Sequence, residues 1–399
     1  MDSRERVLTA LAHKEPDRVP IDFGGMRSTG IMALAYAPLK RYLGIEEGSI
    51  DVYDVGQQLA WVEEPVKQRF SVDVVALDLD ALGPWQPYTL PDGTPARLPA
   101  RYRIERAPDG SQYILDDEGR RVAHMPPGGY YFDGIYRPLA NAETIDDLKR
   151  YKWSGRTDDE LQRLRKAARF LYEETDYAIM GAFGGNILEA GQGLRGWEQF
   201  MIDLAIGGPF LETFLELLTE NHLRNLERYL AAVGDYIQII QMGDDLGTQR
   251  GPQVSLDTYR RWIKPYHKRI YGWVHEHYPH IYVFLHCCGG IYELIPELIE
   301  EGVQILNPVQ TSAYGMDPVR LKREFGADLT FWGGGCETQT TLPRGTPDEV
   351  RAQVRERLEI FAPGGGYVFN QVHNVQYGVP PENVTAMFDA AMEFGSYGA

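Results

Sequence analysis

Short apolar runs alternate with amphipathic stretches along most of this chain. Eight of the apolar runs have the length and the β-branched composition of strands. They lie at residues 18–24, 72–80, 177–185, 236–245, 281–289, 303–310, 329–336 and 367–374. Most begin as continuous apolar sequence, which is typical of parallel strands buried on both faces. Most end in Gly, Asp, Asn, Gln, His or Cys, so polar side chains are expected to meet at one end of a sheet.

Between these strands the apolar residues fall three and four positions apart, which predicts helices. The main helical stretches are residues 143–152, 158–174, 210–234, 257–278, 292–302, 318–326, 346–361 and 380–394. One start is marked by Thr346 followed by Pro347, because a Thr cap before a proline suits the first helical turn. Eight βα units favour an α/β fold of the (β/α)8 TIM barrel class. A doubly wound open sheet is the alternative, since strand count alone does not require closure.

Residues 85–134 interrupt the alternation of strands and helices. They contain the turn signals Pro-Asp-Gly at 91–93, Pro-Asp-Gly at 108–110 and Asp-Glu-Gly at 117–119, separated by short runs in which apolar and polar residues alternate. This pattern predicts an antiparallel β-meander inserted after the second strand. We expect a single barrel domain over residues 1–399, with the insertion on its active-site side as a lid or a partner-docking surface.

The amino-acid composition argues against nucleic acids and membranes as binding partners. The chain has 57 acidic and 40 basic residues, a net charge of −17, which repels nucleic acid and anionic membranes. No apolar stretch is long enough to span a bilayer, and the amino terminus lacks the apolar core of a signal peptide. Three cysteines do not form a disulfide framework. A cytoplasmic enzyme is therefore the expectation, and its oligomeric state, including a homodimer, is left open.

All three cysteines fall at predicted strand ends. His286 and Cys288 are two residues apart, so their side chains project to the same face of a strand. Catalytic zinc sites use three His, Cys or carboxylate ligands and keep one position open. Cys336, from a later strand, supplies the third ligand of such a set. The alternative is that the cysteines are small buried apolar residues, which is the interpretation we favour for Cys287.

Two further residues are candidates for this centre. His373 ends the eighth predicted strand and Glu337 follows Cys336, so either could be a fourth ligand or a supporting group. Zinc is favoured over iron because thiolate and imidazole ligands suit it.

Two pairs of acids also lie at strand ends. Asp244 and Asp245 are adjacent, so at most one is expected to point into the site; we assign Asp244 to general acid–base catalysis and Asp245 to substrate binding. Asp78 and Asp80 share one face of the second strand, where an acid in an apolar strand is costly unless it is used. Both are further catalytic candidates.

Other polar groups at the expected rim are candidates for substrate binding. They are Asn186, Glu189, Asn307, Gln310 and Glu337, together with Asp245. Turn formation is the alternative for Asn186 and Asn307. The glycine runs at 333–335 and 364–366 fit neither a dinucleotide fingerprint nor a P-loop, so nucleotide binding is not predicted.

Several motifs resemble those of the uroporphyrinogen decarboxylase-like superfamily, and more closely its corrinoid-dependent methyltransferase branch. They are SRERVLTALAHKEPDRVPIDFGG from residue 3, GDDLGTQRGPQVSLDTYRRWIKPYHKRI from 243, FLHCCGGIYELIPELIEEGVQILNPVQ from 284, LKREFGADLTFWGGGCETQTTLPRGTPDEV from 321 and GGYVFNQVHNVQYGVPPENVTAMFDAA from 365. The resemblance spans almost the whole chain. It implies a (β/α)8 barrel with its site at the carboxyl ends of the strands.

The two branches of the superfamily imply different chemistry. The decarboxylases are cofactor-free and hold tetrapyrrole carboxylates with an arginine-rich motif near the amino terminus, where this chain has Arg27 alone. Resemblance to the methyltransferases implies zinc ligands at His286, Cys288 and a further cysteine near the last strand. This chain has His373 there, which leaves Cys336, His373 or both as the third ligand.

We therefore expect a methyltransferase that uses zinc at the barrel mouth. It would act as a demethylase, moving a methyl group between a small O- or N-methylated substrate, or a thiol, and a corrinoid (cobalamin) carried by a partner protein. The first alternative is a metal-free decarboxylase that uses Asp78 or Asp80. The second is a non-catalytic protein that binds a tetrapyrrole or corrinoid on the same barrel.

Overall fold

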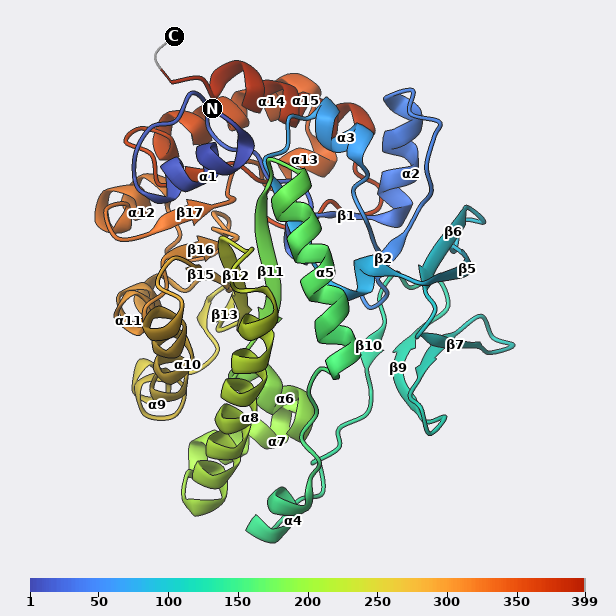
Figure 1. The fold of residues 1–399 in the computed structure, drawn as a ribbon, viewed down its shortest axis with the longest axis vertical. Helices are drawn as coiled ribbons and strands as arrows, with labels where there is room; N and C mark the ends of the chain where they lie inside the picture. The colour runs from blue at the N-terminus through green and yellow to red at the C-terminus, as the bar shows by residue number, and fades with distance from the viewer. Residues whose placement is uncertain (398–399) are drawn as a thin grey trace.

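A parallel sheet forms the centre of the computed structural model, which describes residues 1–397 (Figure 1). Its strands are β4 (Val74–Leu77), β11 (Ala178–Gly184), β12 (Ile239–Gly243), β15 (Tyr282–His286), β16 (Ile305–Asn307), β17 (Thr330–Trp332) and β18 (Tyr367–Val368). They are hydrogen-bonded in the order β4-β11-β12-β15-β16-β17-β18, each parallel to its neighbours. The sheet curls and helices cover its outer face, which confirms an α/β architecture of TIM-like kind.

The first predicted strand, residues 18–24, joins the two edges of this sheet without forming a regular strand. The amide of Phe369, just after β18, donates to the carbonyl of Pro20 at 2.8 Å, and Ile21 forms a parallel bridge with Phe369. On the other side, the amide of Asp73, just before β4, donates to the carbonyl of Ile21 at 2.8 Å. Pro20 has no amide hydrogen to continue the ladder, so isolated bridges replace the predicted strand.

The helices surround the sheet. They are α1 (Ser3–Leu11), α2 (Ala33–Tyr42), α3 (Glu64–Arg69), α4 (Ile145–Arg150), α5 (Asp158–Glu174), α6 (Leu188–Arg195), α7 (Trp197–Ile206), α8 (Pro209–Val233), α9 (Leu256–Trp262), α10 (Lys264–His277), α11 (Ile295–Glu301), α12 (Pro318–Phe325), α13 (Thr341–Arg344), α14 (Pro347–Phe361) and α15 (Pro381–Phe394). A helix forms in every predicted stretch, and α1, α2, α3, α6, α7 and α13 occur where none was predicted. Short 3-10 helices are η1 (Arg27–Thr29), η2 (Leu79–Leu82) and η3 (Tyr292–Leu294).

Two helix boundaries show how local sequence decides them. The side chain of Thr346 accepts a hydrogen bond from the amide of Glu349 at the start of α14, which confirms the predicted cap. The single helix predicted over residues 257–278 is divided into α9 and α10 instead. Pro265 lies in the first turn of α10 and has no amide to bond back to α9, so the chain begins a new helix there.

Residues 85–134 fold as antiparallel strands in two separate sheets, where the sequence predicts one meander. β5 (Trp85–Thr89) and β6 (Pro95–Pro99) form a hairpin. β7 (Arg103–Arg106), β8 (Gln112–Leu115), β9 (Arg121–Met125) and β10 (Asp133–Gly134) form a second sheet in the order β10-β9-β8-β7. Pro99 ends the hairpin and a tight turn leads into β7, which separates the two sheets. Both lie to one side of the central sheet, beyond α5.

The smaller strands were not expected from the sequence. β1 (Ile31–Met32), β2 (Val52–Asp54) and β3 (Leu59–Ala60) form an antiparallel sheet, and β13 (Gly247–Thr248) pairs with β14 (Gly251–Pro252). The β1–β3 sheet places the segment around Tyr53 and Gln57 beside the central cavity described below.

Apolar side chains fill the inside of the curled sheet at its amino-terminal end. This cluster contains Val74, Ala178, Met180, Ile239, Phe284, Ile305, Trp332 and Val368. Val7 and Leu11 of α1 belong to the same cluster, and the carbonyl of Ala10 accepts from the amide of Gly366, just before β18. A larger cluster packs the sheet against the helices. Helix α1 therefore closes the amino-terminal end, and polar groups collect at the carboxyl end.

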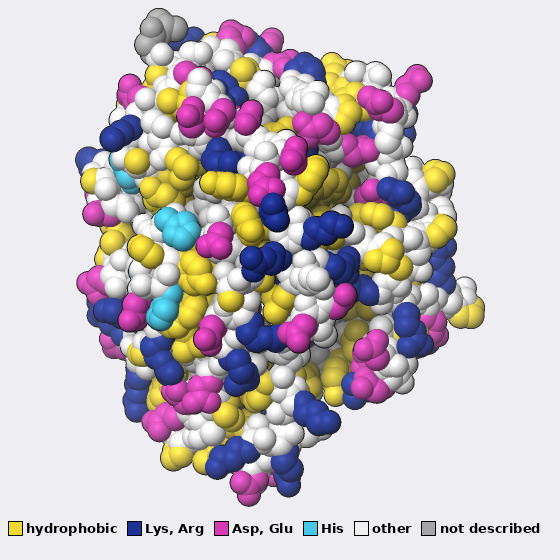
Figure 2. Space-filling view, viewed as in Figure 1, with side chains coloured by type: hydrophobic (Ala, Val, Ile, Leu, Met, Phe, Trp, Pro, Cys, Tyr) yellow, Lys and Arg dark blue, Asp and Glu magenta, His cyan; other side chains and the backbone are white. Residues whose placement is uncertain are grey.

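The surface carries both signs of charge. Figure 2 shows Lys and Arg side chains over α5 with acidic side chains among them, on a chain whose net charge is −17. None of the helices within residues 1–397 is both long enough and apolar enough to cross a membrane.

Candidate metal centre and cavity

A cavity of about 840 Å³ lies at the carboxyl ends of β4, β11, β12 and β15. Its polar lining falls into two groups. The metal half contains His286 and His373, with Asp245, Glu189 and Asn186 beside them. The arginine half contains Arg27, Asp78, Asp80 and Arg101. The curled sheet therefore brings together strand ends that are far apart in the sequence.

His286, Cys288 and His373 form a candidate metal site. One ligand atom from each of the three lies within 4.8 Å of the other two. His286 is the last residue of β15, and Cys288 follows two residues later, with its Sγ 3.3 Å from Nε2 of His286. His373 comes from the segment after β18, and its ring centroid is 5.8 Å from that of His286. Three ligands of the His and Cys type fit a catalytic zinc site with an open position.

Asn307 selects the tautomer of His286. Its amide nitrogen donates to the carbonyl of Trp332 at 2.8 Å, so its amide oxygen faces His286. Nδ1 of His286 lies 2.6 Å from that oxygen and carries the proton that it donates. In the neutral ring the free nitrogen is then Nε2, which is directed at Cys288 and Ser28, as a metal ligand requires. The sequence assigns Asn307 to substrate binding, whereas the structure shows it holding His286.

The pKa values of two of these groups bear on the binding of a cation. Burial raises the pKa of the Cys288 thiol well above its ordinary value, and the neighbouring Asp245 adds to this effect. Burial and the nearby His286 lower the pKa of His373 to about 4, so its imidazole is neutral. A soft divalent metal ion would reverse the first effect, since it displaces the thiol proton on binding.

Cys336, expected as the third ligand, is not part of this group. Its side chain is fully buried in the core between the sheet and the helices, and burial raises its pKa to about 12. Gly333 and Gly334 after β17 have φ values of +109° and +69°, so the chain turns sharply before it reaches Cys336. Of the two candidates for the third ligand, the structure brings His373 and not Cys336 next to His286 and Cys288. Cys287 is buried and accepts a hydrogen bond from the amide of Leu246, which agrees with its expected role as a packed thiol.

Asp244 does not reach the cavity, so the catalytic role predicted for it needs correction. Its carboxylate is fully buried and accepts hydrogen bonds from the amides of residues 187, 188 and 189, at 2.6 to 2.9 Å. It also lies 3.0 Å from Nε2 of His267. Burial alone would lower the pKa of His267, but hydrogen bonds to Asp244 and Glu301 outweigh it and raise the pKa to about 9. Asp244 therefore anchors the start of α6.

Asp245 is the member of the pair that faces the cavity. Its carboxylate accepts from the amide of Cys288 at 2.8 Å and lies 3.7 Å from Nε2 of His286. It holds the candidate ligand loop in place. Adjacent residues of a strand end face opposite sides, which explains why Asp244 and Asp245 have different surroundings.

Glu189 and Asn186 lie side by side in the cavity wall, as candidates for substrate binding. Nδ2 of Asn186 donates to Glu189 at 2.5 Å, and the amide of Asp245 donates to the same oxygen at 3.1 Å. Burial raises the pKa of Glu189 to about 7, and the negative charges of Asp244 and Asp245 add to the rise. Glu189 is thus a carboxyl group that can give or take a proton near neutral pH.

Asp78 and Asp80 form an ion cluster with Arg27 in the arginine half. The guanidinium of Arg27 lies 3.1 Å from Asp78, 3.6 Å from Asp80 and 3.2 Å from Asp54. Arg101 pairs with Asp80 at 2.7 Å. Burial raises the pKa of Asp80, and the Arg101 and Arg27 charges oppose that rise. The acids follow β4 as expected, but they are engaged with arginines.

Gln310 and Glu337 lie outside the cavity lining. Oε1 of Gln310 accepts from the amide of Gly289 at 2.9 Å, so Gln310 supports the loop after β15. Glu337 is buried next to Cys336 and accepts from the hydroxyl of Thr311 at 3.4 Å. Neither residue faces the metal half.

The cavity also contains functional groups that the strand pattern did not predict. They are Ser28, Tyr53, Arg101, Arg156 and His222. Arg101 and Arg156 come from connecting segments, and Ser28 and Tyr53 from η1 and β2, short elements that the sequence pattern did not predict. His222 lies on α8, where the polar group Asn221, His222 and Asn225 interrupts an otherwise amphipathic helix. That interruption was the available signal in the sequence.

The fold and the cavity define an α/β protein of TIM-like kind with a candidate metal site at the carboxyl end of its sheet. A family profile described as uroporphyrinogen decarboxylase (URO-D) matches residues 134–394. The chain belongs to the uroporphyrinogen decarboxylase family.

Individual relatives are distant. The uroporphyrinogen decarboxylase of Alkalilimnicola ehrlichii is 23% identical over 97% of this chain and 93% of its own length. That of Picosynechococcus sp. is 25% identical, but the match covers 42% of this chain and only 46% of the relative. Among solved structures, a methyltransferase from Methanosarcina mazei has a TM-score of 0.60 and 17% identity over 99% of both chains. This last likeness shows a shared fold.

Proposed function

We propose that this protein is a zinc-dependent methyltransferase that moves a methyl group between a small methylated substrate and a corrinoid held by a partner protein. The observation that carries the proposal is the convergence of His286, Cys288 and His373, of which the two histidines line the cavity. The shared fold with a methyltransferase from Methanosarcina mazei supports it. The absence of an arginine-rich stretch around Arg27 makes the decarboxylase branch a weaker match.

The residues of the metal half have separate roles in this proposal. His286, Cys288 and His373 would hold the zinc ion, with His286 oriented by Asn307. A bound zinc ion would supply a Lewis acid that stabilises negative charge on an oxygen, nitrogen or sulfur atom of the substrate. Glu189, with a pKa of about 7, can give a proton to the atom that loses the methyl group and recover it from water. Asp245 keeps the Cys288 loop in place through its backbone amide.

The zinc content of anaerobically purified protein tests the metal site directly. We expect near-stoichiometric zinc in the parent and in Cys336→Ser, because Cys336 is buried away from the site. We expect its loss in Cys288→Ser and His373→Ala. Equal zinc in the parent and in Cys288→Ser, or zinc lost from Cys336→Ser alone, would contradict this ligand set.

Methyl transfer to reduced cobalamin, followed by absorbance, tests the activity. His286→Ala should lower the rate by more than about 100-fold, because removing a ligand exceeds the 10–100-fold typical of supporting residues. A parent protein that loads zinc but transfers no methyl group from any ether, amine or thioether would leave the site intact and overturn the reaction.

Metal-free decarboxylation is the second candidate function. The observation that favours it is the ion cluster of Arg27 with Asp78 and Asp80 inside the cavity of a URO-D family member. In that case uroporphyrinogen consumption would survive zinc removal and be lost in Asp78→Asn. A non-catalytic tetrapyrrole- or corrinoid-binding protein would instead bind the ligand and show neither activity.

A further inference from the structure

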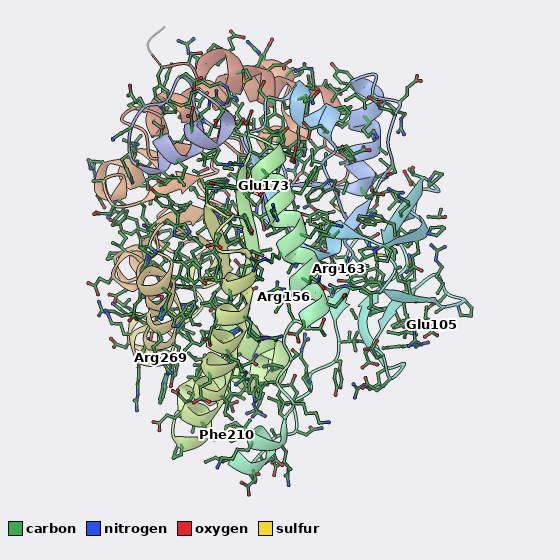
Figure 3. The ribbon with its side chains drawn as sticks, viewed as in Figure 1. Glu105, Arg156, Arg163, Glu173, Phe210 and Arg269 are labelled. Atoms are coloured by element: carbon green, nitrogen blue, oxygen red, sulfur yellow. The ribbon has the colours of Figure 1, made fainter. Side chains whose placement is uncertain are left out.

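Arg156 is a cavity-lining cation that no acid neutralises. It precedes α5, and Figure 3 shows it between α5 and α8, toward the centre of the molecule. One of its terminal nitrogens donates to the carbonyl of Ala182 at 3.0 Å, and the guanidinium lies 4.8 Å from the ring centroid of Tyr229. Within residues 1–397, its guanidinium makes no ion pair. A guanidinium has five N–H donors, so most of those of Arg156 are left for a ligand.

The other two arginines of the cavity differ from it in this respect. Arg27 is shared by three aspartates, and Arg101 is paired with Asp80 at 2.7 Å and with Glu160 at 3.7 Å. Both arginines therefore form ion pairs within the protein. A ligand carboxylate could bind Arg27 or Arg101 only by displacing these acids, whereas it could bind Arg156 without displacing an acid.

The cavity lining contains neutral and acidic groups besides Arg156. The neutral ones include His222, Asn221, Asn225 and Gln241; the acids are Asp78, Asp80, Glu160, Glu189 and Asp245, and none of these forms an ion pair with Arg156 within residues 1–397. Burial lowers the pKa of His222, whose Nε2 lies 2.9 Å from the carbonyl of Asn186, so this histidine is neutral. Of the acids that follow Arg156 in the chain, Asp158 pairs with Arg228 at 2.6 Å, and Glu160 lies 3.7 Å from Arg101.

The backbone that carries Arg156 is held in place. The side-chain amides of Asn221 and Asn225 both donate to the carbonyl of Ser154, at 3.2 and 3.0 Å. Arg228 donates to the carbonyl of Arg156 itself at 2.7 Å. A Cβ added at Gly155 would lie 2.1 Å from the side-chain oxygen of Asn225, so a larger residue there would displace the amide that holds Ser154. The guanidinium is thus presented from a fixed segment, as a binding group should be.

We propose that Arg156 binds a carboxylate of the substrate, so that the small molecule processed in this cavity is an organic acid. The identification of that molecule as a methyl donor or acceptor rests on the proposed function, whereas the charge preference rests on Arg156 and its neighbours alone. A planar guanidinium donates two parallel hydrogen bonds to a carboxylate, which gives both affinity and orientation. Arg156 would fix the acidic end of the substrate while its methyl group faces the metal half.

Matched pairs of small molecules test this proposal. The probes are 4-methoxybenzoate with 4-methoxybenzamide, and methoxyacetate with methoxyacetamide, which are close in size and differ in charge. Calorimetric titration of the full-length zinc-loaded protein should show tighter binding of at least one acid than of its amide. In Arg156→Gln the affinity for that acid should fall about tenfold or more, with the amide unchanged. Arg156→Lys should recover part of the difference.

Arg163→Gln is the control for a general loss of positive charge. Arg163 lies on α5, contacts the carbonyl of Gly83 and does not line the cavity. The proposal is overturned if neither acid binds, if acid and amide bind equally to the parent, or if Arg163→Gln and Arg156→Gln lower acid binding alike. Circular dichroism of each variant shows whether it is folded. Charge-selective binding without any methyl transfer would retain this inference and reject the proposed function.

Discussion

The two halves of the cavity accommodate polar groups in opposite ways. In the arginine half, Arg27 lies among Asp54, Asp78 and Asp80, and Arg101 pairs with Asp80, so both arginines have acidic partners within the protein. In the metal half, His286, Cys288 and His373 have no basic side chain as a partner within residues 1–397, and the carboxylate of Asp245 lies beside them. In the arginine half, the charged side chains already have partners. In the metal half, three ligand atoms point toward one place, and a bound cation would stabilise that arrangement.

This difference helps to separate the residues that support the fold from the residues that bind a ligand. An ion cluster that satisfies itself contributes to the fold whether or not a ligand is present. A set of convergent donors that is not satisfied indicates a missing ligand. The following changes should therefore affect the two halves differently.

The largest effect is expected beneath the metal half, in Asp244→Ala. This change leaves protonated His267 and three backbone amides at the start of α6 without their acceptor. We expect the free energy of unfolding to fall by about 3–5 kcal/mol, as for removal of one member of a buried pair. Urea unfolding of the zinc-free protein measures it. Asp245→Asn, the exposed neighbour, should change stability by less than about 1 kcal/mol; a similar loss in both would refute the distinction between them.

A pH dependence of stability should come from Glu189. Its pKa is raised from an ordinary 4.5 to about 7, so the folded state holds this proton more tightly than the unfolded state. Stability is therefore greatest below pH 4.5 for this group and is lost as the pH rises through 7, by about 1–3 kcal/mol. In the zinc-free protein, Glu189→Gln should remove this decline between pH 5 and pH 8. An unchanged decline in the variant would assign it to another group.

Zinc affinity should depend on Asn307. Without its amide oxygen, His286 loses the hydrogen bond that places the proton on Nδ1. Asn307→Ala should weaken zinc binding about 10–100-fold, measured by competition with a chelator. Gln310→Ala is the matched control, because it also supports the loop after β15 but does not touch His286. Equal weakening in both variants would indicate a general loosening of the loop.

The smallest effect is expected from Arg27→Gln in the arginine half. The side chain of Arg27 is 45% exposed, and Arg101 stays paired with Asp80 after the change. We expect a loss of only about 1 kcal/mol in thermal unfolding and no change in zinc content. Loss of zinc from this variant would show that the two halves are coupled.

The sequence predicted that polar residues gather where the strands end. His286 is the last residue of β15 and Cys288 follows the strand, while Asp78 and Asp80 follow β4, with Asp78 capping η2 and Asp80 within it. The regular βα alternation likewise predicted the curled parallel sheet. Residues 18–24 were the exception, where Pro20 prevents a regular ladder.

The rest depended on contacts that no local pattern encodes. Cys336 was assigned to the site because it follows a strand, but the glycines before it redirect the chain. Asp244 was expected in the site although Asp245 is the residue that lines it, because alternation says that two neighbours face apart and does not say which faces inward. Arg156 comes from a connecting segment whose position is fixed by side chains of α8.

Helix α1 has a consequence for the order of events in a catalytic cycle. Because Val7 and Leu11 fill the opposite end of the sheet, the cavity has its opening at the carboxyl end. In the proposed reaction, a macromolecular partner and a small metabolite would both have to use this one entrance to the cavity. The metabolite would have to enter before the partner docks, and its demethylated form could leave only after the partner departs. Steady-state kinetics should then follow a compulsory order of addition, with excess partner acting as an inhibitor.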